Sequence, residues 1–238
     1  MCGRFYIASE DETGEINRMI DEAARRQRAI VGECTLAAGE IFPSAVTAAL
    51  ARGKSGQPGA YPMRWGFLVR RDEKRSGLII NTRSETALQK PMFRASMLER
   101  RCLLPFSWYF EWDRRGALAD AGAETDKDGQ TSFDLGGASV PHRQNGRQRG
   151  EKSAPVRYAI RPETPGLMFL AGIYRYEKDQ PLPAFSILTM PPAPEIAFIH
   201  DRMPVIFSAE RKAEWLSDSA EPDEMLKKAQ MQMSFRIA

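Results

Sequence analysis

The segment that most constrains the fold of this chain is Arg101–Trp112, a run rich in β-forming and aromatic residues. It predicts a central pair of strands or one long, bent strand. Because side chains alternate between the two faces of a strand, Tyr109 and Glu111 share one face and three aromatic rings share the other. Those rings are Trp108, Phe110 and Trp112. A carboxylate among so many rings could serve as a general acid or base; alternatively, Glu111 is an ordinary outward-facing residue.

Shorter runs of strand-forming residues surround this segment. They cover residues 45–51, 61–69, 78–80, 156–161, 167–174, 184–190 and 205–207. Helical spacing of apolar residues, or a capping residue, predicts helices over 11–30, 92–100, 194–198, 208–216 and 223–233. The chain thus combines many short strands with a few helices, in one large domain or two small ones.

Residues 114–155 differ in composition from the rest of the chain. Ala, Gly, Asp, Gln, Ser and Arg dominate, and few large apolar residues are present. Such a segment contributes little to a core, so it predicts a mobile insertion within a domain. Its basic stretch at 142–149 is either a solvated loop or a contact for phosphates.

Composition limits the possible environment and partners. No run of 18 apolar residues or secretory signal is found, which predicts a cytoplasmic protein with no membrane contact. Three cysteines fit a reducing compartment, and two histidines without a paired C-x-x-C argue against a metal site. The net charge of +3 means that any nucleic-acid surface must be local.

Cys2, directly after Met1, is the strongest chemical signal. Removal of Met1 would leave an α-amine and a thiol on adjacent carbons. The amine can form an imine with an aldehyde, and the thiol can then close a thiazolidine ring. Cys2 could instead attack an amide as an N-terminal nucleophile, with its own amine as the base. A second residue that is merely buried is the remaining interpretation.

Further polar residues follow predicted strands. Asn81, Arg83 and Glu85 come after the run at 78–80, and His200, with its neighbours Asp201 and Arg202, precedes the run at 205–207. Strand ends often deliver functional groups to one cleft. Taken singly, each of these residues could also just end a strand or shape a turn.

Five blocks in order resemble one known family. They are Met1-Cys2-Gly3-Arg4-Phe5, Met63-Arg64-Trp65-Gly66, Asn81-Thr82-Arg83-Ser84-Glu85-Thr86, Arg101–Trp112 and Ile199-His200-Asp201-Arg202-Met203-Pro204-Val205-Ile206. The family is that of the SOS response-associated peptidases (SRAP), or abasic-site processing proteins. The resemblance covers roughly residues 1–112 and 156–217.

The resemblance implies an α+β fold: a curved, largely antiparallel and barrel-like sheet with short flanking helices, in a single domain over 1–238. It implies a monomer that binds single-stranded DNA containing abasic sites, at the nucleoid when DNA is damaged. Met1 would be removed, by the protein itself or by another peptidase. Cys2 would then form a thiazolidine crosslink with the abasic aldehyde, and an abasic-site (AP) lyase activity could accompany it. No cofactor or metal is implied.

The resemblance also assigns roles to residues. The implied catalytic residues are Cys2, Asn81, Glu111 and His200. The implied DNA-binding residues are Arg4, Arg83, Trp65, Arg70, Arg71 and Arg202.

The chain departs from the family pattern in two places near the expected site. Glu40–Ser44 replaces an Asn-x-Ala-Pro stretch, and Phe67–Arg71 replaces a tryptophan that wedges into DNA, so Arg70 and Arg71 would have to act by charge. Two other functions remain open: an amidohydrolase of the glutamine amidotransferase type, and a non-catalytic module that binds single-stranded DNA.

Overall fold

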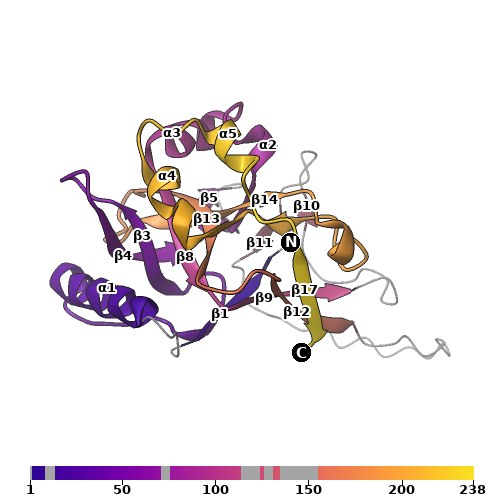
Figure 1. Cartoon of the computed structure of the whole chain (residues 1–238). Helices are drawn as coiled ribbons and strands as arrows, with labels where there is room; N and C mark the ends of the chain where they lie inside the picture. Colours follow the sequence, from indigo (N-terminus) through magenta and orange to yellow (C-terminus); the bar gives the residue numbers. More distant parts are fainter. Residues whose placement is uncertain (1, 9–13, 71–75, 114–123, 126–130, 135–154) are drawn as a thin grey trace, which may run out of the picture.

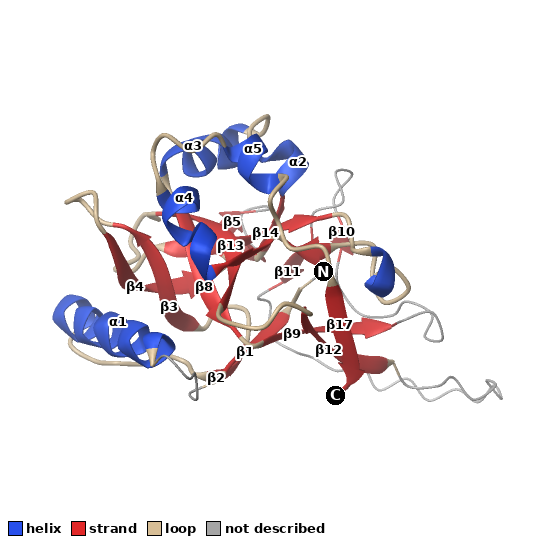
Figure 2. Cartoon of the chain, in the orientation of Figure 1, coloured by secondary structure: helices blue, strands red, loops and turns tan. Residues whose placement is uncertain are grey.

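A computed structural model describes residues 2–8, 14–70, 76–113, 124–125, 131–134 and 155–238. The fold is a mixed α+β structure, as predicted. Figure 2 shows the strands in the middle of the molecule and the helices on its outside.

The largest sheet has eight strands in the order β15-β14-β4-β3-β8-β13-β16, with β7 beside β14. Their bounds are β3 (Val46–Arg52), β4 (Pro58–Trp65), β7 (Asn81–Arg83), β8 (Arg101–Phe106), β13 (Met168–Arg175), β14 (Ala184–Met190), β15 (Met203–Pro204) and β16 (Ile206–Ser208). Most neighbours are antiparallel, and β13 also pairs with β14. The sheet therefore curls into a ring, but β14 and β4 close it with only two parallel residue pairs, so it is not a true barrel.

A second sheet has five antiparallel strands in the order β17-β12-β9-β1-β2. They are β1 (Arg4–Ile7), β2 (Gly39–Ile41), β9 (Trp108–Asp113), β12 (Val156–Pro162) and β17 (Met233–Ile237). The predicted central run is therefore a pair of strands, β8 and β9, that belong to different sheets. Ser107 makes the corner between them: its N–H donates to the carbonyl of Tyr6 at 2.8 Å, and its hydroxyl accepts from the N–H of Ala8 at 3.1 Å.

The predicted strand over 61–69 is in fact two strands, β4 and β5 (Phe67–Arg70). Gly66 lies between them with a φ of 111°, a value that L side chains rarely adopt. β5 opens a third sheet of four strands in the order β10-β11-β6-β5.

The third sheet includes part of the predicted insertion. β10 (Glu124–Thr125) and β11 (Thr131–Asp134) form a hairpin, and β11 pairs with β6 (Ser76–Ile79). The rest of the segment 114–154 lies outside the described residues.

Helices cover the curled sheet on two sides (Figure 1). α1 (Glu15–Val31) packs on β3 and β4, whereas α2 (Ser84–Ala87), α3 (Pro91–Glu99), α4 (Lys212–Leu216) and α5 (Pro222–Leu226) gather on another side. Two 3₁₀ turns, η1 (Pro194–Ile196) and η2 (Ala209–Arg211), complete the described helices. The helix predicted over 223–233 is wrong beyond Leu226, because Met233 pairs with Pro162 in β17 and tertiary pairing overrides helical propensity.

The core consists of two clusters of buried side chains. One joins the curled sheet to the five-stranded sheet and includes Cys2, Phe5, Trp65 and Tyr109. The other lies beneath the helices and includes Trp215. Among the described residues, no helix is both long and apolar enough to span a bilayer.

Candidate functional site

Cys2 is held at the junction of the two larger sheets. It precedes β1 and is 0% exposed. Its carbonyl accepts a hydrogen bond from the side-chain amide of Asn81 at 2.9 Å, and its thiol donates to the carbonyl of Arg4 at 3.5 Å. Asn81 is 1% exposed and opens β7, which pairs with β14. The curled sheet thus fixes the position of a residue next to the chain end.

Glu111 faces the same junction from β9. It is 4% exposed, and its negative charge is close enough to affect the Cys2 thiol. Burial, followed by the charge of Glu111, raises the pKa of the Cys2 thiol above its usual range. Tyr109, two residues earlier on the same face, is 0% exposed, and burial raises its pKa as well, with further contributions from Glu111 and Cys2. Cys2, Tyr109 and Glu111 therefore form one buried, electrostatically coupled group.

His200 lies on the loop that follows η1. Its Nδ1 atom is 2.6 Å from a carboxylate oxygen of Asp201 and accepts from the N–H of Arg202 at 3.1 Å. These contacts suit two protonation states, because Nδ1 accepts from Arg202 only without a proton and donates to Asp201 only with one. Both contacts hold the imidazole ring through its Nδ1 atom.

Arg202 and Glu85 form a second polar group beside β14. Arg202 donates to both carboxylate oxygens of Glu85, at 2.5 and 2.7 Å, and to the carbonyl of Thr189 at 2.7 Å. Burial acts to raise the pKa of Glu85, but the hydrogen bonds and charge of Arg202, with the charge of Arg83, outweigh it and lower that pKa. Arg202 could reach a phosphate only if this ion pair opened, so its DNA contact stays a prediction.

Arg83 is the last residue of β7 and pairs directly with Thr189 of the neighbouring strand β14. Its Nε atom, like that of Arg202, is buried without a hydrogen-bond partner among the described residues. Arg202, however, is held by Glu85 through two hydrogen bonds, so Arg83 is the better candidate of the two for binding an incoming anion.

Arg4 lies on the outward face of the five-stranded sheet. Its guanidinium is 4.6 Å from the ring centre of Phe42 and 5.2 Å from that of Trp112. Glu40 contacts Arg4 at 3.4 Å and Arg157 at 2.6 Å.

Other arginines continue this pattern along the same face. Arg157 covers the ring of Phe110 at 3.8 Å, while Arg161 and Arg236 lie 5.2 and 4.6 Å from the ring of Trp108. We call Arg4, Arg157, Arg161 and Arg236 the arginine row.

The structure contradicts the predicted role of Trp65 in DNA binding. Trp65 is 0% exposed, stacks on Phe185 with ring centres 6.1 Å apart, and donates its indole N–H to the carbonyl of Ile80 at 3.0 Å. A ring inside the core cannot stack on a base. It instead supports the backbone just before Asn81. Arg70 is exposed at the end of β5, and Arg71 lies outside the described residues.

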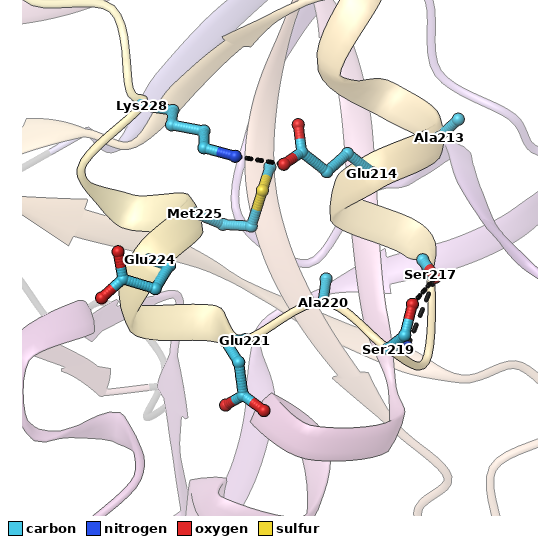
Figure 3. A pocket seen from close by; sticks show the side chains of 9 residues that line it. All are labelled: Ala213, Glu214, Ser217, Ser219, Ala220, Glu221, Glu224, Met225 and Lys228. Atoms are coloured by element: carbon cyan, nitrogen blue, oxygen red, sulfur yellow. Dashed lines mark hydrogen bonds and ion pairs between the residues drawn. The ribbon is translucent and has the colours of Figure 1, made fainter.

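A surface pocket elsewhere does not contain any of these residues. Figure 3 shows this cavity of about 480 Å³, formed around α4 and α5. Glu214, Glu221 and Glu224 give it an acidic lining, and Glu214 is paired with Lys228. Excess negative charge makes it a poor site for nucleic acid. Within the described residues, no three His, Cys, Asp or Glu side chains are grouped as potential metal ligands.

Sequence reasoning missed three features of the site. Tyr109 could have been found, since alternation already places it on the face of Glu111. Glu40 carried no signal of its two arginine partners, which come from β1 and β12. Tyr158 pairs with Glu111 across β12 and β9, a contact that joins residues far apart in the sequence.

The geometry defines a class of protein: an α+β protein whose buried cysteine, next to the chain start, faces a glutamate and an asparagine. Sequence comparison names the family. The family described as SOS response associated peptidase (SRAP) matches residues 1–133 and 144–236. The chain belongs to the SRAP family, which confirms the resemblance found in the sequence.

Individual relatives agree with this assignment. The chain is 28% identical to the abasic site processing protein YoqW of Bacillus subtilis over 236 residues, which cover 94% of this chain and 84% of that protein. It is 30% identical to YobE of the same organism over 169 residues, covering 68% and 60%, respectively. A more distant relative is the abasic site processing protein HMCES of Gallus gallus, 26% identical over 171 residues that cover 67% of this chain and 45% of that protein.

Solved structures confirm the fold. A protein from Bacteroides thetaiotaomicron superposes with a TM-score of 0.61 at 19% identity, covering 99% of this chain and 91% of that one. A phage-related protein from Bordetella bronchiseptica gives 0.60 at 17% identity, with coverage of 100% and 94%.

Proposed function

We propose that this protein processes abasic sites in single-stranded DNA by forming a covalent crosslink through Cys2. The observation that carries the proposal is the position of Cys2: it directly follows Met1 in the sequence, and in the structure it is buried beside Asn81 and Glu111. The relatives named abasic site processing proteins support the same substrate. An abasic sugar opens to an aldehyde, and an N-terminal cysteine carries the two groups that capture aldehydes.

The reaction has two steps after Met1 is removed. The α-amine of Cys2 adds to the aldehyde carbon, and loss of water gives an imine. The thiol sulfur then bonds to the imine carbon, and its proton passes to the nitrogen, which becomes the secondary amine of a thiazolidine. Burial suits the second step, because a desolvated site protects the imine from water.

Glu111 and His200 would move the protons. Glu111, beside Cys2, would accept a proton from the amine and return one to the departing hydroxyl. His200, with partners for both protonation states, would protonate the sugar oxygen as the ring opens. Asn81 would hold the backbone of Cys2 so that the amine and thiol face the sugar.

Phosphate contacts would come from Arg4 and Arg83, with Arg70 and Arg71 as further candidates. Single strands are held mainly by such contacts, which are independent of sequence. An abasic site lacks its base and can bend into a narrow site at low cost.

Removal of Met1 and AP lyase activity belong to the same proposal. The Met1–Cys2 peptide must be hydrolysed before the amine exists, and the imine could alternatively eliminate the 3′ phosphate and cut the strand. Intact mass after cell-free translation with an inhibitor of methionine aminopeptidase tests self-cleavage. Loss of Met1 under those conditions supports it, and retention of Met1 assigns the step to another enzyme.

One experiment separates the candidate functions. The Met1-processed protein is incubated with abasic single-stranded DNA, with intact single-stranded DNA and with glutamine. A heat-stable crosslink with abasic DNA alone supports the proposal. Ammonia release from glutamine would favour the amidohydrolase, and reversible binding alone would favour a non-catalytic module.

Cys2→Ser and Cys2→Ala are the matched variants. Cys2→Ser keeps the amine, so borohydride should still trap an imine while the stable adduct is lost. Cys2→Ala should retain reversible DNA binding, since phosphate contacts supply the affinity. A Cys2→Ser adduct as durable as that of the wild type would contradict the thiazolidine.

A further inference from the structure

Three aromatic rings lie beside the proposed site, at the outer edge of the five-stranded sheet. Phe198 and Phe235 are 5.1 Å apart between ring centres, and Tyr158 lies 5.7 Å from Phe198 and 5.8 Å from Phe235. The interplanar angles of 68°, 89° and 77° describe a triangle of edge-to-face contacts. We call these three residues the aromatic platform.

The platform is continuous with the site. Tyr158 pairs directly with Glu111, so both side chains point to the same face of the sheet. Phe198 is two residues before His200 in the chain. The platform therefore contacts one element that carries Glu111 and another that carries His200.

Part of the platform is open to solvent. Phe235 is 42% exposed, and Ile237, on the same face of β17, is 73% exposed. Val156, on that face of β12, is 38% exposed. An apolar patch that adjoins a polar site is typical of a ligand-contact surface.

The next residue along β17 adds a positive charge at the same edge. Arg236 is exposed and emerges on the opposite face, over the ring of Trp108. β17 is the last strand of its sheet in the described structure. An exposed apolar surface and a guanidinium thus lie on opposite faces of one edge strand, so a nucleic-acid strand passing around this edge meets a surface for a base on one face and a charge for a phosphate on the other.

We infer that the aromatic platform stacks on the base of a nucleotide that adjoins the abasic site, with Arg236 on the phosphate of a neighbouring nucleotide at the other face of the edge strand. The inference rests on the proposed function and adds a subsite to it. In this chain Trp65 is buried and cannot stack on DNA, so the platform supplies an aromatic surface from a different part of the fold. It would fix the strand on one side of the lesion.

A double-mutant cycle between protein and DNA tests the platform. The DNA is a short single strand with a central tetrahydrofuran, a stable abasic analogue, and a second base is deleted at each flanking position in turn. Phe235→Ala should weaken binding by about 5- to 150-fold, the range expected for one stacked base. Deleting the stacked base should weaken DNA binding by the wild type by a similar factor. The same deletion should not weaken binding by Phe235→Ala any further. Additive losses at every position would overturn the inference.

Matched variants separate stacking from folding and from general apolar contact. Tyr176→Ala, at a residue 73% exposed and remote in sequence from the site, should bind like the wild type. Phe235→Leu keeps apolar volume, so an unchanged affinity and coupling in this variant would contradict stacking. In the wild type, 2-aminopurine at the coupled position should be quenched on binding, and Phe235→Ala should relieve the quenching.

Crosslinking is scored in parallel on true abasic DNA. If the protein crosslinks but Phe235→Ala shows no coupling to any deleted base, the inferred stacking is wrong and the proposed function stays in place. Coupling without crosslinking would support the platform as a subsite for single strands and refute the crosslinking function. Loss of self-association in Phe235→Ala, with no effect on DNA, would identify the patch as an interface between copies and overturn the inference.

Discussion

The two faces of β9 place their side chains in opposite environments. Inward, Tyr109 and Glu111 are 0% and 4% exposed and are coupled to the Cys2 thiol. Outward, Trp108 and Trp112 are half-buried, and the arginine row covers them. Aromatic residues make up the outward face, whereas the buried inward face combines one tyrosine with a carboxylate, so hydrophobicity alone does not predict which face is buried.

The two faces differ in whether their charged and titratable groups are buried or exposed to solvent. The inward face excludes water, and this burial raises the pKa of the Cys2 thiol and of Tyr109, as in sites that suit chemistry. The outward face leaves its guanidinium groups partly in solvent over aromatic rings, an arrangement that suits the proposed phosphate contacts. One strand thus separates the proposed reactive surface from the proposed binding surface, and each prediction below probes one of these two faces.

The largest effect is expected for Glu111→Gln on the inward face. Glutamine keeps the size of glutamate but cannot exchange a proton, so crosslinking should slow by ~10²–10⁴-fold. Affinity for single-stranded DNA should stay the same, because the outward face is intact. A single-turnover time course across a pH series measures the rate. A wild-type rate and pH profile would show that Glu111 is not the acid–base group.

The second prediction concerns the thiols of the Met1-containing chain. Cys2 is buried with a raised pKa, whereas Cys34 is exposed, so an alkylating reagent should modify Cys34 more than about tenfold faster at neutral pH. The rate at Cys2 should rise with pH, because only the thiolate reacts. In the unfolded chain the thiol loses its proton near its ordinary pKa of ~8.5, so stability should fall as pH rises beyond that value. Mass spectrometry of the modified peptides, and thermal melts over the same pH range, provide the test. Equal rates at the two cysteines would contradict the burial.

A smaller effect is expected for Arg4→Ala on the outward face. One phosphate contact would be lost, so binding should weaken for all sequences and the salt slope should fall by about one. Crosslinking at saturating DNA should change little. Arg28→Ala, on α1, is the control for a general loss of charge. A salt slope equal to that of the wild type would remove Arg4 from the phosphate contacts.

The smallest effect is expected for Tyr109→Phe. The Tyr109 hydroxyl is buried without a hydrogen-bond partner among the described residues. Deleting such a group removes a desolvation cost, so the free energy of unfolding should be unchanged or rise by up to ~1 kcal/mol. A denaturant titration measures it. A clear loss of stability would show that the hydroxyl has a partner in solution.

Much of the fold could be predicted from local sequence signals. Helix α1 and strands β3, β8 and β9 follow from periodicity and composition. The division of 61–69 depended on the positive φ of Gly66, and the strand β17 depended on the open edge of β12. Neither the break at Gly66 nor the strand β17 can be predicted from the neighbouring sequence, because each depends on a pairing partner distant in the chain.

The site was less predictable than the fold. Cys2, Asn81 and Glu111 could be selected because each stands at a strand end or alternates against aromatic residues. Trp65 was misassigned because sequence does not show which face of β4 turns inward. Arg202 has the residue type for phosphate, but its pairing with Glu85 arises from α2 and a loop more than 100 residues later.

The hydrogen bond from Asn81 to Cys2 has a consequence for the start of the chain. Termini usually fray, yet this bond grips the carbonyl on the far side of Cys2 from Met1. Cutting the Met1–Cys2 peptide leaves that carbonyl untouched. The new N-terminal residue would therefore already be held in place by Asn81 at the moment its α-amine is released.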